Sequence, residues 1–171
     1  KNEMDPNKAG PKDEFSNGNG SLMRILPIAF YIKDMKMEKQ MEIIHDVSSI
    51  THGHPRSKIA CGYYIQFILQ ILKGGNKNEA FKNTNKIIND HYELEPYKSE
   101  LKHFKRILNG DILKLNDNEI SSSGYVIDAL EASLWSFLTT GSFDNAVLKA
   151  VNLGGDTDTI GAITGGLAGV Y

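Results

Sequence analysis

The amino-acid sequence predicts an all-α protein, and three observations carry that prediction. Apolar residues recur at the three- and four-residue spacing of a helix face in segment after segment, as at Met37, Met41 and Ile44. No stretch keeps the strict alternation of apolar and polar residues that marks a half-buried strand. Glycines, prolines and short polar runs separate the periodic segments. A chain of 171 residues has the length of one domain, and we find no internal repeat.

The first 15 residues are polar and lack periodicity, so we expect a loop or disordered arm there, followed by a single all-α domain over residues 16–171. In the first helix, Pro27 would mark a kink or a later start. Pro55 suits the first turn of a long, broadly apolar helix. The helices expected in this half are Leu22 to about Ile32, 36–50, and Pro55 to about Lys73.

The second half of the chain continues the helical pattern. Pro96 separates two amphipathic segments whose lysine-rich outer faces we interpret as solvated. A polar connection over residues 109–123 then leads into a strongly apolar helix. The helices expected here are 76–90, 97–108, about 125–137, 142–151, and one that begins near Asp156 and continues through Gly169.

Composition excludes several classes of function. A net charge of −2, from 19 basic and 21 acidic residues, gives no basis for nucleic-acid or membrane binding. The single cysteine, Cys61, excludes an intramolecular disulfide, and its apolar surroundings favour a buried structural thiol. We find no signal peptide and no apolar run near 20 residues, which fits a cytoplasmic location. The chain starts at Lys1 and stops at Tyr171 within a helical pattern, so we expect a fragment of a larger protein.

The most distinctive stretch begins at Gly154 and Gly155, which would form a tight turn. Three oxygen ligands, Asp156, Asp158 and Thr159, follow within four positions. Carboxylates and a hydroxyl at a helix N-terminus suit Mg²⁺, Mn²⁺ or Ca²⁺ rather than zinc. The same residue types are ordinary helix caps, so the residues alone leave capping and metal binding as alternatives.

The helix after this turn is rich in small residues, including Gly161, Gly165 and Gly166. Each glycine destabilises an isolated helix by about 1 kcal/mol relative to alanine. So many small residues imply that other backbones approach closely. We therefore expect this helix to lie buried at the centre of the domain.

A second glycine turn, Gly18-Asn19-Gly20-Ser21, leads into an apolar segment. Such a turn presents backbone N–H groups to an anion such as phosphate, and an ordinary loop capped by Ser21 is the alternative. Arg24 follows in an apolar stretch, where we expect it to be half-buried and paired with a carboxylate.

A short turn that carries two histidines lies between the second and third expected helices. His52 and His54 have no second Cys/His pair elsewhere in the chain, which disfavours a zinc site. We interpret His52 as a hydrogen-bonding residue of a ligand site. His54, directly before a proline, is expected to be a structural helix cap.

Four stretches together resemble the ADP-ribosylglycohydrolase family, and their order and spacing match that family across nearly the whole chain from Ser16. They are Asn17–Arg24, Thr51–Pro55, Gly124–Ala132 and Leu153–Ala162, of which the last is the most specific. The resemblance implies a compact orthogonal bundle of helices. It also implies hydrolysis at the anomeric carbon of ADP-ribose, which frees a modified protein side chain or a small acceptor.

The resemblance further assigns roles to residues. Asp156, Asp158 and Thr159 would be ligands of Mg²⁺ or Mn²⁺, in a site that holds two ions in the complete family. The loop from Gly18 to Ser21 would wrap the diphosphate and ribose of ADP-ribose. His52 would contact this ligand and Tyr125 would lie near its adenine. No catalytic residue is identified.

The sequence departs from the family in one respect. Family members carry an earlier acidic segment that supplies the other metal carboxylates, and these 171 residues contain no counterpart. About half of the expected metal site is therefore present, since a hard cation normally takes about six oxygens, and the bundle would be incomplete. Whether the chain is an enzyme stays open. The alternatives are a non-catalytic ADP-ribose or nucleotide-binding module and a structural remnant of the same fold.

Overall fold

The computed structural model describes residues 6–171, in which the regular elements are all helices; the all-α prediction is confirmed. The one extended pairing in this range is an isolated antiparallel bridge between Gly18 and Tyr125. No helix of the described chain is both long and apolar enough to cross a lipid bilayer. The α-helices are α1 Gly20–Arg24, α2 Ile28–Ile32, α3 Met37–Ser49, α4 Pro55–Leu72, α5 Lys77–His91, α6 Lys105–Leu108, α7 Val126–Leu138, α8 Phe143–Val151 and α9 Thr157–Val170, and the 3₁₀ helices are η1 Pro6–Lys8, η2 Lys98–Phe104, η3 Asp111–Lys114 and η4 Asp117–Glu119.

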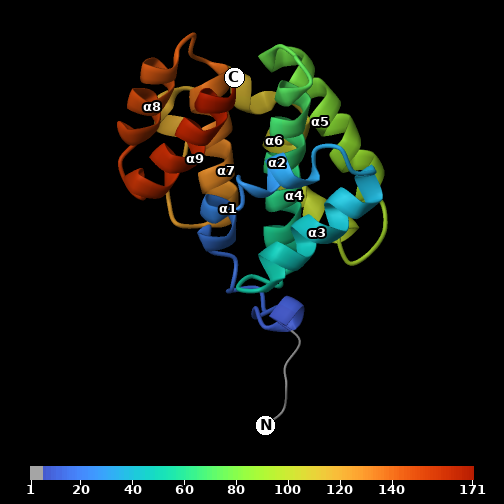
Figure 1. Cartoon of the computed structure of the whole chain (residues 1–171). Helices are drawn as coiled ribbons and strands as arrows, with labels where there is room; N and C mark the ends of the chain where they lie inside the picture. Colours follow the sequence, from blue (N-terminus) through green and yellow to red (C-terminus); the bar gives the residue numbers. More distant parts are fainter. Residues whose placement is uncertain (1–5) are drawn as a thin grey trace.

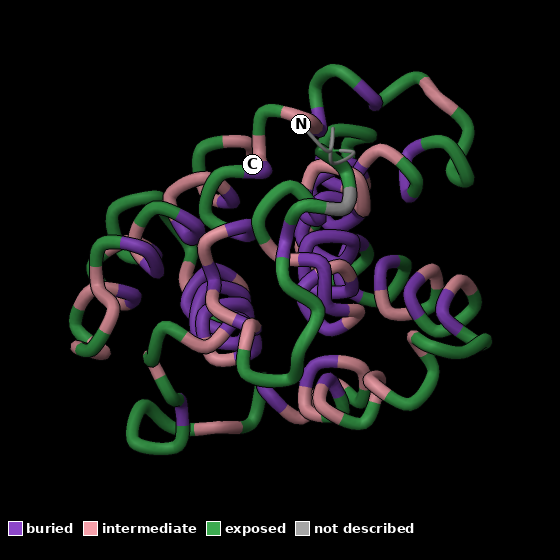
Figure 2. Tube along the Cα trace, turned by 90° about the horizontal axis from the view of Figure 1, so that it is seen from below, coloured by how far each residue is buried: buried purple, intermediate pink, exposed green. Residues whose placement is uncertain are grey.

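Helices α4 and α7 form the interior of the molecule. Nearly all their residues are buried, including the large side chains of Tyr63, Phe67 and Trp135. Helix α4 packs against α3, α5 and α7, while α8 and α9 pack against α7 (Figure 1). The buried residues gather in two interior helices when the chain is viewed from below (Figure 2). Fully burying one large apolar side chain contributes about 1.5–3 kcal/mol, so these two helices anchor the fold.

Helix α9 is not central, which corrects the expectation from its small residues. One face, with Ile163 and Leu167, is buried, and the helix packs on α7 and α8. Ala162 and Gly169 are exposed. Small residues allow close approach but offer little apolar area to bury, so the larger side chains of α4 and α7 take the centre instead.

Two other segments also differ from prediction. The single helix expected from Leu22 to about Ile32 is divided into α1 and α2, because Pro27 directly precedes α2 and has no N–H to continue a helix. The helix expected over 97–108 is instead the 3₁₀ helix η2 followed by the short α6. The polar connection 109–123 contains the two short 3₁₀ helices η3 and η4.

The polar arm expected over residues 1–15 falls partly outside the described residues, which begin at Pro6. From there the chain forms η1 and a loop that is hydrogen-bonded to the end of α3 and to the turn after it. The Gly10 amide donates to the Ser49 carbonyl (2.7 Å), and the Gly53 amide donates to the Pro11 carbonyl (2.9 Å). These bonds bring the next residues of the loop, Glu14 and Phe15, to the site described below.

Candidate functional site

The glycine turn and the segment before α7 lie side by side. The Asn19 amide donates to the Gly124 carbonyl (3.0 Å), and the Val126 amide donates to the Asn17 carbonyl (3.0 Å). This pairing places Gly18 next to Tyr125. Two stretches that are far apart in the sequence therefore form one continuous wall.

The acidic turn joins the same wall through Asp156. The Asp156 amide donates to the Ser122 carbonyl (2.8 Å), and its Oδ2 accepts a hydrogen bond from Asn19 Nδ2 (2.7 Å). The hydrogen bond from Asn19 lowers the pKa of the Asp156 carboxyl. Asp156 therefore stands ionised at the point where the glycine turn, the Gly124 segment and α9 meet.

The acidic turn contains three side chains with oxygen donors. Asp156 directly precedes α9 but makes no side-chain capping hydrogen bond, Asp158 is exposed and Thr159 is buried. Among residues 6–171, no group of three or more His, Cys, Asp or Glu side chains could hold a metal ion. Two carboxylates and a hydroxyl have the right chemistry for Mg²⁺ or Mn²⁺ but fewer donors than the six such ions usually take. They fit part of a metal site.

His52 faces the glycine turn. A Cβ atom placed on Gly20 would lie 3.0 Å from His52 Cε1, and one on Gly18 would lie 3.6 Å from Nε2. The opposite edge of the ring is held by Thr51, whose Oγ1 is 2.8 Å from His52 Nδ1. Burial and the nearby Arg24 charge lower the pKa of His52, so the ring is neutral near pH 7.

Arg24 is not paired with a carboxylate in the described chain, which corrects the sequence expectation. Its guanidinium is exposed and donates to Thr51 Oγ1 (2.6 Å) and to the Val47 carbonyl (3.1 Å). The prediction that His54 caps a helix is confirmed, because its Nδ1 accepts from the Arg56 amide (3.1 Å) at the start of α4.

Ser21 lies at the inner end of the glycine turn. It is fully buried, and Cys61 Sγ donates to its Oγ over 3.5 Å. Its side chain therefore points into the core, although it belongs to the stretch expected to bind ligand. Cys61 is a buried free thiol, as predicted, and burial raises its pKa.

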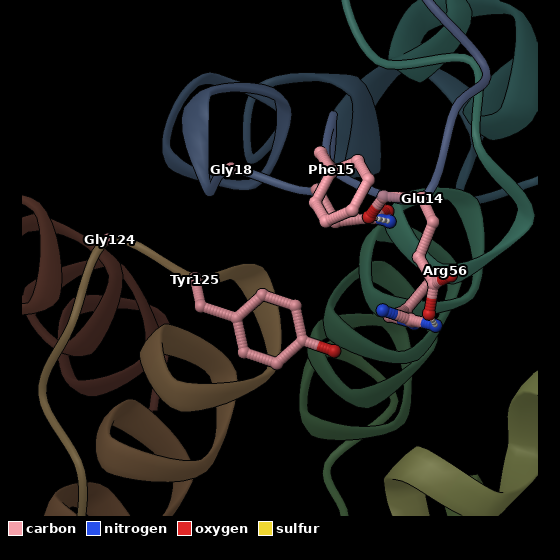
Figure 3. A pocket seen from close by; sticks show the side chains of 7 residues that line it. Glu14, Phe15, Gly18, Arg56, Gly124 and Tyr125 are labelled. Atoms are coloured by element: carbon pink, nitrogen blue, oxygen red, sulfur yellow. Dashed lines mark hydrogen bonds and ion pairs between the residues drawn. The ribbon is translucent and has the colours of Figure 1, made fainter.

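A pocket of about 460 Å³ opens beside this wall. It is lined by Glu14, Phe15, Asn17, Gly18, Arg56, Gly124 and Tyr125. In Figure 3 the Tyr125 ring forms one side, its hydroxyl is directed toward Arg56, and Phe15 lies across from it. The Phe15 side chain is 96% exposed, so a large apolar ring at this opening has no protein contact that would hide it from water.

Arg56 is the principal site residue that the sequence analysis missed. Its guanidinium is buried, and Nε donates to Glu100 (2.7 Å) while Nη2 lies 3.6 Å from Glu14. It also lies 5.8 Å from the centre of the Tyr125 ring. The sequence held a weak signal, since Arg56 is a charge in the first turn of a helix that is mostly apolar from Ile59 onward. Phe15 and Glu14 gave no such signal, because they lie in an aperiodic arm.

Residues 6–171 thus form a helical domain in which a glycine turn, an acidic helix start and a pocket lined by Tyr125 meet, which is the class of helical domain with one candidate ligand site. The family model described as ADP-ribosylglycohydrolase matches residues 1–171. The chain belongs to the ADP-ribosylglycohydrolase family.

Individual relatives agree with this assignment. The chain is 33% identical over 152 residues to ADP-ribosylarginine hydrolase Tri1 of Serratia proteamaculans (strain 568), covering 89% of this chain and 38% of that protein. It is 28% identical over 161 residues to the ADP-ribosyl-[dinitrogen reductase] glycohydrolase of Rhodospirillum rubrum, covering 93% and 47%. A solved structure of an ADP-ribosylglycohydrolase-related protein complex superimposes with a TM-score of 0.77 at 27% identity, covering 94% of this chain and 52% of that chain. The chain thus spans about half, or less, of the length of these proteins.

Proposed function

We propose that this chain forms the ADP-ribose-binding half of an enzyme that hydrolyses ADP-ribose linkages and frees ADP-ribose from modified protein side chains or small acceptors. The observation that carries the proposal is the hydrogen bond from Asn19 to Asp156 (2.7 Å), which joins the glycine turn to the acidic turn beside the pocket. The relatives named as ADP-ribosylarginine hydrolase and ADP-ribosyl-[dinitrogen reductase] glycohydrolase support the reaction class.

The pocket suggests how ADP-ribose would lie. Tyr125 offers a flat face of the kind on which an adenine ring can stack, and Phe15 stands at the opening. Gly18 and Gly20 lack side chains, so a diphosphate can come close to the backbone there. His52 faces the same turn and would contact the ligand. The chemistry of these side chains supports the roles that we propose for them.

Asp156, Asp158 and Thr159 would hold Mg²⁺ or Mn²⁺ at the start of α9. When bound, such an ion can polarise an oxygen and position water for hydrolysis. This chain supplies only some of the required donors, so the remaining carboxylates would come from a segment beyond these 171 residues or from another chain. We place the reaction in the cytoplasm, in keeping with the lone buried cysteine.

Isothermal titration calorimetry with ADP-ribose, in the presence and absence of Mg²⁺, tests the binding step. We expect binding that Mg²⁺ strengthens, and Asp158→Ala should remove the Mg²⁺ effect while Asp34→Ala, an exposed aspartate in the connection before α3, should retain it. No binding in either condition would contradict the proposal. If Asp158→Ala keeps the full Mg²⁺ effect, the metal assignment is wrong.

Release of ADP-ribose from an arginine-modified protein then separates an enzyme from a non-catalytic binding module. Binding without release by the chain, restored when the acidic segment of a relative is added, would support the division of the site between two segments. Binding without release in both arrangements would favour the binding module.

A further inference from the structure

A basic groove lies between α5 and the η2–α6 segment. One hollow of about 360 Å³ is lined in part by Lys98, Lys102 and Lys105. A second hollow of about 340 Å³ includes Lys82. Both hollows are lined by Leu108 and Asn109, so they adjoin each other, and together we call them the lysine groove.

The lysines of the groove have no carboxylate within ion-pair distance in the described chain. No carboxylate lines either hollow, and the four lysines form no ion pair within residues 6–171. Some exposed lysines elsewhere in the described chain pair with a carboxylate three or four residues away, as in Lys86–Asp90 on α5 and Lys114–Asp111 on η3. Others, such as Lys33, Lys36 and Lys73, form no ion pair within residues 6–171, but they do not line these hollows.

The feature that marks the lysine groove is the gathering of four lysines around hollows that no carboxylate lines. The protein as a whole carries a net charge of −2, yet the groove concentrates four positive charges. Like charges held close together raise the local potential and attract anionic groups.

The walls of the groove indicate which anion fits. Between the lysines lie Leu101, Leu108 and Leu113, and the hollows contain no arginine. The single aromatic residue among their lining, Phe81, is only 4% exposed. Single-stranded nucleic acids bind largely by stacking bases on exposed aromatic rings, which this groove does not offer. A peptide that alternates carboxylate and aliphatic side chains matches both the lysines and the leucines.

The groove adjoins the candidate site through η2. Glu100 accepts a hydrogen bond from Arg56, which lines the pocket, and Lys98 and Lys102 each lie two residues from Glu100. A 3₁₀ helix rises about 2 Å per residue, so the groove begins within about one turn of the residue that holds Arg56. A protein whose modified side chain entered the pocket could lay its adjoining segment along η2.

We propose that the lysine groove is a docking surface for an acidic segment of the ADP-ribosylated protein on which the chain acts, an inference that rests on the proposed function. The expected partner is a modified protein that carries carboxylate side chains near its ADP-ribosylated residue. Binding of the acidic segment would be fast, because opposite charges steer the two partners together. It would also weaken as salt is added, because the charges are exposed and salt screens them over about 10 Å at 0.1 M.

Fluorescence anisotropy with a labelled twelve-residue peptide of Glu, Asp and Leu tests the proposal. The triple variant Lys98→Gln/Lys102→Gln/Lys105→Gln should bind about tenfold more weakly, since each exposed ion pair is weak and three are removed. The matched control, Lys33→Gln/Lys36→Gln/Lys73→Gln, removes three exposed lysines elsewhere and should bind as the wild type does. A peptide with Gln and Asn in place of the acids should not bind.

The outcomes distinguish this proposal from the proposed function. ADP-ribose titration should be unchanged in the triple variant, which also shows that the variant is folded. If the wild type binds ADP-ribose but not the acidic peptide, or if both triple variants lose the peptide equally, the docking surface is wrong and the proposed function stands. If a single-stranded oligonucleotide of equal charge binds more tightly than the peptide and is lost only in the groove variant, the acidic-peptide assignment is overturned.

Discussion

Asn19 Nδ2 donates to Asp156 Oδ2 over 2.7 Å, and this hydrogen bond joins two turns that are 137 positions apart in the chain. Asn19 is buried and belongs to the glycine turn, while Asp156 precedes the last helix. One amide thus fixes the distance between the segment proposed to hold a diphosphate and the segment proposed to hold a cation.

Removing this amide should weaken both the fold and the ligand site. We expect Asn19→Ala to lower the free energy of unfolding by about 1.5–3 kcal/mol, since hydrogen bonds to charged groups contribute in this range. ADP-ribose should bind about tenfold more weakly, because the glycine turn is no longer held beside Asp156. Urea unfolding and calorimetry measure the two effects. Asn83→Ala, on the exposed face of α5, is the control and should change neither; an Asn19→Ala protein with wild-type affinity would show that the bond does not organise the site.

The local parts of this site could be predicted from the sequence, because each is a short turn with its own chemistry. The Gly18–Ser21 turn and the Asp156 turn were recognised in this way. Their contact could not be predicted, since it depends on how α1 and α9, the helices that follow the two turns, pack on α4 and α7. Arg56 was overlooked because a cation in the first turn of a helix usually faces water, whereas here Glu100 and the fold bury it. The position of α9 was misjudged because small residues indicate close approach without saying which helix takes the centre.

Thr51 should determine which ring nitrogen of neutral His52 carries the hydrogen. Arg24 can only donate, so it occupies one lone pair of Thr51 Oγ1, and the Thr51 hydroxyl is then free to donate to His52 Nδ1. His52 Nε2 would carry the hydrogen and present a donor toward the glycine turn. Nitrogen-15 NMR should therefore show an unprotonated Nδ1 and a protonated Nε2 at pH 8.

The matched variants for this prediction are Thr51→Val, which keeps the shape but removes the hydroxyl, and Thr51→Ser, which keeps the hydroxyl. Thr51→Val should lose the tautomer preference and bind ADP-ribose about fivefold more weakly. Thr51→Ser should resemble the wild type in both respects. A wild-type protein with the proton on Nδ1 would show that Thr51 accepts from the ring, and the prediction would be wrong.

His45 and Glu131 should make the stability of the fold depend on pH in opposite directions. Burial lowers the pKa of His45, whose ring nitrogens lie against the hydroxyls of Tyr92 and Tyr97, to about 3. Burial raises the pKa of Glu131, which lies 3.4 Å from Arg106, to about 7. The folded state disfavours protonated His45, so stability is lost as pH falls from about 6.5 toward 3. It also disfavours ionised Glu131, so stability is lost as pH rises from about 4.5 to 7.

Between pH 7 and pH 5 the two effects are each about 2 kcal/mol and nearly cancel in the wild type. Relative to the wild type, His45→Gln should therefore gain about 2 kcal/mol of unfolding free energy on acidification over this range, and Glu131→Gln should lose about as much. Urea unfolding at the two pH values gives both numbers. Burial also lowers the pKa of the other histidines, but that contribution is common to all three proteins and leaves the differences intact. If the free energy of unfolding changes with pH in the same way in the wild type and in both variants, neither His45 nor Glu131 has the shifted pKa that its burial implies.

Alanine substitutions at Gly154 and Gly155, the two glycines before Asp156, distinguish backbone strain from a steric clash. Gly154 has φ of 77° and open space where a Cβ would lie. Gly155 has φ of 64°, and a Cβ there would collide with the Ser122 carbonyl oxygen, the same atom that accepts from the Asp156 amide. Gly154→Ala should cost about 1–2 kcal/mol of stability, the usual penalty for a left-handed alanine. Gly155→Ala should cost about 2 kcal/mol more and displace Asp156.

Only the second substitution should therefore weaken ADP-ribose binding, because only it moves Asp156 away from Asn19. Urea unfolding gives the stability difference and calorimetry gives the affinity. Gly141→Ala, which has neither a positive φ nor any atom within 4 Å of the added Cβ, serves as the neutral control. If Gly155→Ala is as mild as Gly154→Ala and keeps its ligand affinity, the contact between Ser122 and the acidic turn does not position Asp156, and the two halves of the site are joined through Asn19 alone.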